Sequence, residues 1–158
     1  MLTFVIGPNN SGKSAYAESI IAGLKSTKRY YIATMIPYGE EGQARVKKHL
    51  KMRENLSMET LEDPYFEKTD IIEAGADVLL EDVSNLVANR LFERGLKACE
   101  TISKEIQALN SKTSNLVIVS IGGIVAEGYD EETLRYINML NQINEELQGF
   151  ADKVIVRE

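Results

Sequence analysis

The stretch that decides the fold reads Gly7-Pro8-Asn9-Asn10-Ser11-Gly12-Lys13-Ser14 and fits the pattern G-x-x-x-x-G-K-[ST]. It follows the apolar run Leu2–Ile6 and leads into a segment with helical periodicity, which is the context that a phosphate-binding P-loop requires. Gly7 and Gly12 let the backbone curl so that successive N–H groups point at phosphate oxygens, and the helix that follows adds the positive end of its dipole. We therefore predict that all eight residues bind the phosphates of a nucleotide, with Lys13 supplying a cation for the β- and γ-phosphates.

A magnesium site is predicted from Ser14 and an acidic residue at the end of another strand. The Ser14 hydroxyl can complete a Mg²⁺ shell, and a P-loop enzyme usually places a carboxylate near it. The apolar run Val78–Leu80 leads directly into Glu81-Asp82. We expect Glu81 to hold the metal, directly or through water, and Asp82 to cap the following helix, although the position alone leaves the opposite assignment open.

Apolar, β-rich runs alternate along the chain with segments of helical periodicity. The predicted strands are Leu2–Ile6, Tyr30–Ala33, Val78–Leu80, Leu116–Val119 and Val154–Val156. The predicted helices are Gly12–Leu24, Glu40–Met52, Asp82–Glu93, Leu96–Leu109 and Glu131–Phe150. Continuous rather than alternating apolar strands are typical of a sheet covered on both faces, and the alternation of strand and helix predicts crossover connections.

The predicted fold class is therefore α/β, a P-loop NTPase-like, mostly parallel sheet flanked by helices in three layers. We expect one domain over residues 1–158, because no linker or internal repeat divides the chain. Residues 37–73 form a helical excursion from the sheet, without a convincing strand between Pro37 and Thr69. Excursions of this kind often close over a ligand.

Composition and charge exclude several classes of function. The 158 residues are 44% hydrophobic and 27% charged, as in an ordinary globular domain. A net charge of −6 argues against nucleic-acid binding. No apolar run reaches the roughly 20 residues that span a bilayer, so we expect no membrane association. The single cysteine, Cys99, favours a reducing cytoplasmic setting, with Cys99 as a small buried residue rather than a nucleophile.

The only histidine lies in a row of polar residues at four-residue spacing. Glu41, Arg45, His49 and Arg53 stay on one side of a helix, because each step of four residues rotates by about 40°. The imidazole could attack a nucleotide phosphate, while the two arginines neutralise the charge that accumulates on phosphorus and keep the ring neutral. Without further information, a solvated basic helix face is the favoured alternative.

Together these motifs resemble the bifunctional adenosylcobinamide kinase/adenosylcobinamide-phosphate guanylyltransferases of cobalamin biosynthesis. The resemblance runs over most of the chain and needs no gap between Tyr31 and Arg53. The matching residues are Gly7–Ser14, Tyr31–Thr34, Glu41, Arg45, His49 and Arg53, Thr60-Leu61-Glu62, Leu79-Leu80-Glu81 with Asn89, Gly123-Ile124-Val125, and Asn144 through Asp152.

The resemblance implies two activities and a set of residues. One activity phosphorylates the aminopropanol hydroxyl of adenosylcobinamide from ATP or GTP. The other forms a guanylyl-histidine from GTP, releases pyrophosphate and passes GMP to the corrinoid phosphate; His49 matches the guanylylated histidine. Family members are trimers, so a homotrimer is expected. The expected catalytic residues are His49, Lys13, Arg45 and Arg53, and the expected nucleotide contacts beyond Gly7–Ser14 are Thr34, Glu62 and Glu81.

Some positions depart from the family pattern. The Asn-Glu turn after the fourth predicted strand is replaced by Ser120-Ile121-Gly122, and the proline that closes the motif is Ala126. The Arg-Asp pair of the last long helix is Ile137-Asn138, and Met58 is the nearest residue to a missing tryptophan. These changes fall on the expected substrate side. Two alternatives therefore stay open: a P-loop kinase for another small alcohol, and a nucleotide-binding paralogue without catalysis.

Overall fold

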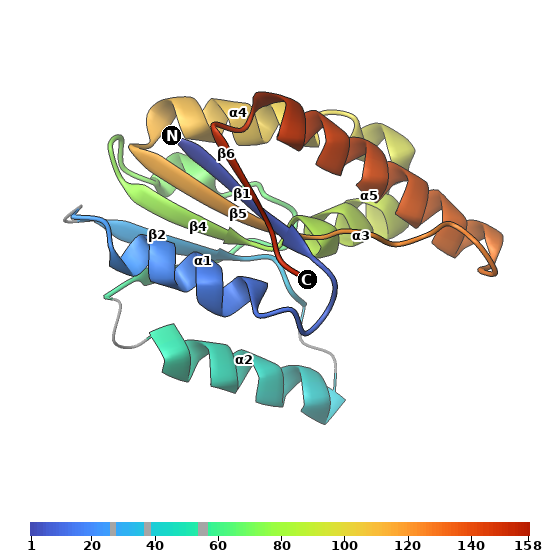
Figure 1. Cartoon of the computed structure of the whole chain (residues 1–158), viewed down its shortest axis with the longest axis horizontal. Coiled ribbons are helices and arrows are strands. Elements are labelled where there is room, and N and C mark those ends of the chain that lie inside the picture. The colour runs from blue at the N-terminus through green and yellow to red at the C-terminus, as the bar shows by residue number, and fades with distance from the viewer. Residues whose placement is uncertain (26–27, 37–38, 54–56) are drawn as a thin grey trace.

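One parallel sheet with helices on both faces forms the body of the protein (Figure 1). The computed structural model describes residues 1–25, 28–36, 39–53 and 57–158, without the side chains at positions 49, 52 and 53. The strands are β1 (Leu2–Gly7), β2 (Arg29–Ala33), β3 (Glu59–Glu62), β4 (Asp77–Glu81), β5 (Asn115–Ile121) and β6 (Lys153–Val156). The α-helices are α1 (Lys13–Ala22), α2 (Gly39–Arg53), α3 (Val83–Arg94), α4 (Ile102–Lys112) and α5 (Glu131–Phe150), with 3-10 turns η2 (Thr69–Ile71) and η3 (Leu96–Cys99). The predicted three-layer α/β/α fold is confirmed.

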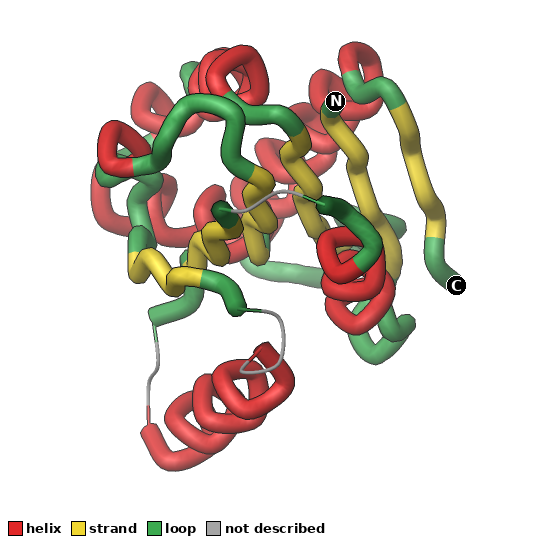
Figure 2. Tube along the Cα trace, turned by 90° about the vertical axis from the view of Figure 1, so that its left-hand side faces the viewer, coloured by secondary structure: helices red, strands yellow, loops and turns green. Residues whose placement is uncertain are grey.

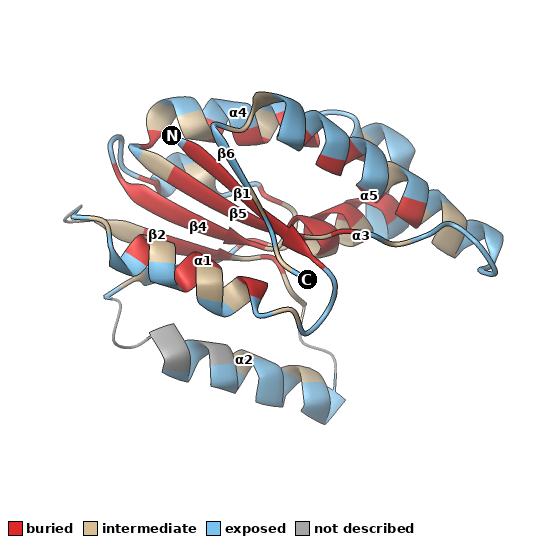
Figure 3. Cartoon of the chain, in the orientation of Figure 1, coloured by how far each residue is buried: buried red, intermediate tan, exposed pale blue. Residues whose placement is uncertain are grey.

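Each face of the sheet packs against its own helices, which explains the continuous apolar runs in the sequence. Phe4 of β1 belongs to the cluster shared with α3, α4 and α5, whereas its neighbour Val5 packs with Ala17 and Ile21 of α1. Both Phe4 and Val5 are fully buried, and the central strands are buried along their length (Figure 3). A sheet buried on both faces provides a rigid platform for side chains at its edge.

The strand order, β3-β2-β4-β5-β1-β6, brings the two predicted phosphate-site elements to one edge. β5 lies between β1 and β4, and its residue Val119 pairs with Val5 on one side and Glu81 on the other. The loop after β1 and the acidic end of β4 therefore lie on either side of β5. In parallel α/β sheets, ligands bind outside the carboxyl ends of the strands.

The prediction that residues 37–69 contain no strand is wrong, because β3 extends the sheet beside β2. Tyr30 to Ala33 pair in parallel with Glu59 to Glu62. Only Leu61 of the four β3 residues is buried. This edge strand therefore lacks the apolar run by which strands are predicted from sequence. The helical part of the excursion is confirmed by α2, which lies apart from the sheet on the side of α1 (Figure 2).

The prediction of one helix over Leu96–Leu109 is also wrong, because η3 and α4 are separate elements. The carbonyl of Ala98 accepts a hydrogen bond from Nη1 of Arg90, at 3.0 Å, so a side chain of α3 binds this turn. Cys99 is 1% exposed and is packed against α3 rather than continuing a helical stripe, which confirms its expected burial. Among the described residues, no helix has the length and apolar character to cross a membrane.

Arg90→Met is expected to lower the free energy of unfolding by about 3 kcal/mol. The Arg90 side chain is 5% exposed and donates to the carbonyls of Tyr65 and Ala98. It also binds both carboxylate oxygens of Glu105, at 2.5 and 2.8 Å. The variant leaves these acceptors without their donor, at a place where water replaces it poorly. Denaturant unfolding monitored by circular dichroism measures the change.

Glu105→Gln provides the pH control for the same ion pair. Burial raises the pKa of Glu105, but hydrogen bonds from Arg90 and Thr101 outweigh it, so the pKa lies below its ordinary value of 4.5. A carboxyl with a lowered folded-state pKa stabilises the protein above that ordinary value and loses the contribution as the pH falls through the folded-state pKa. The stability difference between wild type and Glu105→Gln should therefore shrink in acid, and a difference independent of pH would contradict this assignment.

Candidate functional site

The glycine-rich loop, residues 7–14, curls as the sequence predicts. Asn10 has a φ of 61° and Gly12 a φ of 75°, both in the left-handed region. Gly12 is the N-cap of α1 and makes no side-chain capping bond, so the loop meets the positive end of the helix dipole. Lys13 is 8% exposed, and its Nζ donates to the carbonyl of Pro8 at 3.1 Å. The loop therefore has the backbone shape and the cation that a bound phosphate needs.

Two carboxylates lie at the end of β4. Glu81 is 8% exposed and accepts a hydrogen bond from the hydroxyl of Tyr31. Asp82 accepts from the backbone N–H of Asn85 at 2.7 Å, which confirms its predicted role as the cap of α3. Burial, partly offset by that hydrogen bond from Asn85, raises the pKa of Asp82 to about 6, and the charge of Glu81 adds to the increase. The charge of Lys13 acts in the opposite direction, which places all three groups in one electrostatic neighbourhood.

Thr34 binds the backbone at this acidic end of β4. Its hydroxyl accepts from the N–H of Asp82 at 2.8 Å and donates to the Asp82 carbonyl at 2.7 Å, and the residue is fully buried. Asn89 donates to the carbonyls of Thr34 and Pro64, both at 2.8 Å. In this structure the Thr34 hydroxyl is occupied by the Asp82 backbone, and Asn89 binds the same corner; the expected contact between Thr34 and the nucleotide stays a prediction.

The end of β5, beside the glycine-rich loop, is held by a second polar network. Asn144 accepts from the Ser120 hydroxyl at 2.6 Å and donates to the carbonyl of Ile121 at 3.0 Å. The N–H of Gly122 donates to the carbonyl of Gly7 at 3.1 Å. A Cβ at Gly122 would lie 2.5 Å from the Ile6 side chain, so the turn that departs from the family pattern is closely fitted to β1.

A cleft of about 880 Å³ joins these elements to α2. The sequence-predicted residues that line it are Asn9, Asn10, Ser11, Gly12, Lys13, Ser14, Arg45, Glu62 and Glu81. Gly7 and Pro8, at the base of the loop, and the buried Thr34 do not line it. Glu62 is the last residue of β3, and the pairing of β3 with β2 places it at the cleft.

α2 brings part of the predicted basic row to the cleft. Arg45 and Lys48 line the cleft. The predicted residues His49 and Arg53 belong to the same helix, but their side chains lie outside the described part of the chain. Position 49 directly follows Lys48 and stands one turn beyond Arg45.

The sequence analysis missed Tyr31 and Lys48 as parts of the site. Tyr31 is the register partner of Leu79, and Glu81 stands two residues further along β4 on the same face. That relation depends on knowing that β2 and β4 are neighbours. Lys48 stands outside the four-residue spacing of Arg45, His49 and Arg53, so the helical row does not single it out from its basic neighbours.

The donor set suits a magnesium ion that is shared with phosphates. Ser14, Glu81 and Asp82 line one cleft and offer a hydroxyl and two carboxylates, which are hard oxygen ligands. The charge of Glu81 contributes to the raised pKa of Asp82, after the larger effect of burial, and a cation bound between the two carboxylates would relieve their repulsion. Within the described residues there is no group of three or more His, Cys, Asp or Glu that could hold a metal. A site with few protein ligands suits Mg²⁺, which usually keeps water and phosphate oxygens in its shell.

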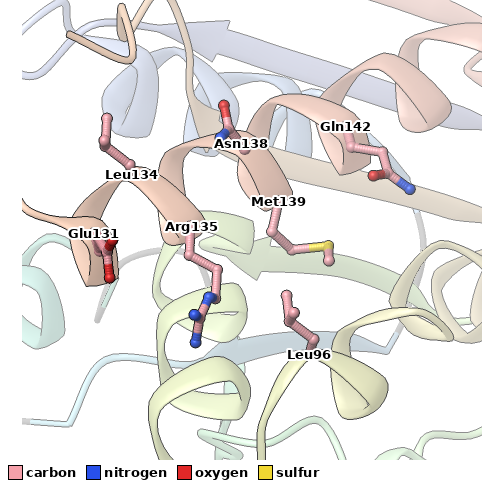
Figure 4. A pocket seen from close by; sticks show the side chains of 7 residues that line it. All are labelled: Leu96, Glu131, Leu134, Arg135, Asn138, Met139 and Gln142. Atoms are coloured by element: carbon pink, nitrogen blue, oxygen red, sulfur yellow. The ribbon is translucent and has the colours of Figure 1, made fainter.

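A second hollow, of about 460 Å³, lies on the outer face of α5 (Figure 4). Its lining comes from one side of α5 together with Leu96, and none of the predicted site residues belongs to it. Asn138 lines this hollow, whereas Ile137 is 2% exposed and belongs to the core. The Ile137-Asn138 departure therefore contributes to the packing and outer surface of α5, away from the glycine-rich loop.

Comparison with known proteins agrees with this geometry. No curated protein matches the chain. The sequence profile of the cobinamide kinase / cobinamide phosphate guanyltransferase family matches residues 3–157, nearly the whole chain. The match spans the glycine-rich loop, the acidic end of β4 and α2, and it confirms the resemblance seen in the sequence. The chain therefore belongs to the cobinamide kinase / cobinamide phosphate guanyltransferase family of cobalamin-biosynthesis transferases.

Proposed function

We propose that this chain phosphorylates the aminopropanol hydroxyl of adenosylcobinamide and transfers GMP from GTP to the resulting phosphate. The observation that supports this proposal most directly is the cleft, which has the glycine-rich loop on one wall and Arg45 and Lys48 of α2 on another. Phosphates bound by the loop would face the helix that carries His49. Family membership supports the reaction type, and the cleft supports the pairing of these two elements.

In the proposed nucleotide complex, backbone N–H groups of residues 9–14 bind the phosphate chain. Lys13 leaves the Pro8 carbonyl to bind the β- and γ-phosphates, since a phosphate oxygen is a stronger acceptor for an ammonium group. Ser14 and Glu81 would hold Mg²⁺, with Asp82 near enough to share the role. When bound, this ion would neutralise charge on the phosphates. In the kinase reaction, the corrinoid hydroxyl oxygen forms a bond to the γ-phosphorus and loses its proton to solvent, while the bond from that phosphorus to the bridging oxygen breaks and the nucleoside diphosphate leaves.

In the guanylyl transfer, His49 is the proposed nucleophile. A ring nitrogen forms a bond to the α-phosphorus of GTP, the bond from that phosphorus to the bridging oxygen breaks, and pyrophosphate leaves. An oxygen of the corrinoid phosphate then attacks the same phosphorus, and the phosphorus–nitrogen bond breaks to restore the imidazole. Arg45, an exposed residue on the cleft, is placed to stabilise the charge that accumulates on the phosphoryl oxygens.

We also propose that the working form is a homo-oligomer, a trimer by family resemblance. Several large apolar side chains are exposed on the single chain, among them Val125 at 68% and Tyr129 at 52%, in the segment after β5. Exposed apolar groups of this size are suited to a subunit contact. Light scattering of the purified protein gives the mass that tests this state.

The proposed function is tested with GTP labelled at the α-phosphate. The wild-type chain is expected to acquire label that is stable in alkali and lost in acid, as a phosphorus–nitrogen bond requires, and cobinamide phosphate is expected to remove it. In parallel, label at the γ-phosphate should move to cobinamide. Transfer of only the γ-label to an alcohol would contradict the transferase half and support a plain kinase. Tight nucleotide binding with neither transfer would support the catalytically silent paralogue.

A further inference from the structure

The C-terminal end of the chain is bound to the back of the glycine-rich loop. β6 runs parallel to β1, and the N–H of Arg157, just after β6, donates to the carbonyl of Ile6 at 2.8 Å. A Cβ at Gly7 would lie 2.6 Å from the carbonyl oxygen of Arg157 and 3.1 Å from its Cβ. The C-terminus accordingly ends beside the turn between β1 and α1 (Figure 1). A side chain at position 7 would therefore clash with the Arg157 backbone, and glycine leaves room for this close contact.

The Arg157 side chain continues over the loop itself. Its Nε donates to the carbonyl of Ser11 at 3.4 Å, a long hydrogen bond, and its guanidinium carbon lies 4.9 Å from the ring centre of Tyr16. Its Nη2 would be 3.6 Å from a Cβ at Gly12. The guanidinium is therefore fixed between the first turn of α1 and the Ser11–Gly12 peptide. It does not line the nucleotide cleft.

The contact with Ser11 determines the direction of the next N–H group. The Ser11–Gly12 peptide is trans, so its carbonyl and its N–H point in opposite directions. Arg157 does not line the cleft, so a Ser11 carbonyl that accepts from Arg157 leaves the Gly12 N–H on the opposite side of the same peptide. A cation on the carbonyl also polarises the peptide and strengthens its N–H as a donor.

From this geometry we infer that Arg157 is a positioning residue for nucleotide binding, which orients the Gly12 N–H toward a phosphate through the Ser11 carbonyl. This inference rests on the proposed phosphate-binding role of the glycine-rich loop. The Tyr16 ring holds the guanidinium in place through a cation–π contact. Arg157 acts from outside the cleft, so the effect concerns phosphate binding rather than recognition of the base.

The test measures the dissociation constants of Mg²⁺-GTP and of inorganic triphosphate by calorimetry on the full chain. Arg157→Gln is expected to raise both constants about tenfold, the usual effect of one charge-assisted hydrogen bond. Equal losses for the two ligands are the signature of a phosphate effect. Arg157→Lys keeps the charge and one donor and should fall between wild type and Arg157→Gln. Tyr16→Leu, which removes the ring and keeps the arginine, should raise the constants about threefold, whereas Tyr16→Phe should not change them.

Lys153→Gln is the matched control, because it removes an exposed positive charge from the same strand at a distance from the loop. Melting temperatures measured without ligand identify any variant that loses affinity because it is unfolded. If Arg157→Gln is unfolded, the comparison of Tyr16→Leu with Tyr16→Phe tests the proposal instead. If the wild type binds GTP and both Arg157→Gln and Tyr16→Leu bind it with the same dissociation constants, the role of Arg157 is overturned. The proposed function would remain intact. Equal weakening by Lys153→Gln would overturn the role of Arg157 as well. No binding of GTP by the wild type would instead remove the proposed function.

Discussion

Lys13→Met is expected to weaken binding of Mg²⁺-GTP by about a hundredfold, the loss of roughly two charge-assisted hydrogen bonds to phosphate. The Lys13 side chain is 8% exposed and lies over the loop, with its Nζ on the Pro8 carbonyl at 3.1 Å. Met keeps the length and the apolar contacts of the stem but has no charge. The loss should therefore fall on phosphate affinity rather than on packing. Calorimetric titration of wild type and variant with the nucleotide measures it.

Lys104→Met is the matched control, because Lys104 is exposed on α4, away from the cleft. The control should bind GTP like wild type. Lys13→Arg keeps the charge but replaces a compact ammonium with a larger planar group, so it should recover only part of the affinity. If Lys13→Met binds GTP as tightly as wild type, Lys13 does not bind the β- and γ-phosphates. The kinase proposal would then lose its main support.

The elements that the sequence predicts correctly are those with a strong local pattern. β1, β4 and β5 are buried on both faces, so their side chains form unbroken apolar runs. β3 has no such run, because it is an edge strand with one buried residue in four. The break between η3 and α4 depends on Arg90, eight residues before Ala98 in sequence but on another helix. Helix periodicity carries no information about such a contact.

The same distinction applies to the candidate site. Lys13 and Ser14 could be predicted as site residues, and Asp82 as a cap, because each belongs to a pattern of close neighbours in sequence. Arg157 could not, because the residue it binds, Ser11, lies at the other end of the chain. Thr34 was assigned to the nucleotide from its place in a matching motif, and only the structure shows that its hydroxyl is used by Asp82. Tertiary contacts of this kind require the strand order, which the sequence does not reveal.

His49→Ala is expected to abolish guanylylation of the protein, lowering the rate by about a thousandfold or more, as for the loss of other enzyme nucleophiles. Transfer of the γ-phosphate from GTP to cobinamide should continue in this variant, because that reaction needs no covalent intermediate. The assay is the labelling experiment with α-labelled and γ-labelled GTP, run on both proteins. The split between the two activities separates a lost nucleophile from a misfolded chain, since a misfolded chain would lose both.

Two further variants on α2 sharpen the result. Lys47→Ala changes an exposed residue of the same helix that does not line the cleft, so both activities should be retained. Arg45→Met removes a guanidinium from the cleft wall and should slow guanylylation by about a hundredfold, the usual effect of losing one donor to a developing phosphoryl charge. Normal labelling of His49→Ala would show that the imidazole is not the nucleophile, and the basic row of α2 would then be a charged helix face beside a plain kinase site. Because Arg45 and Lys48 already line the cleft, we expect position 49 to meet the α-phosphate when the nucleotide binds.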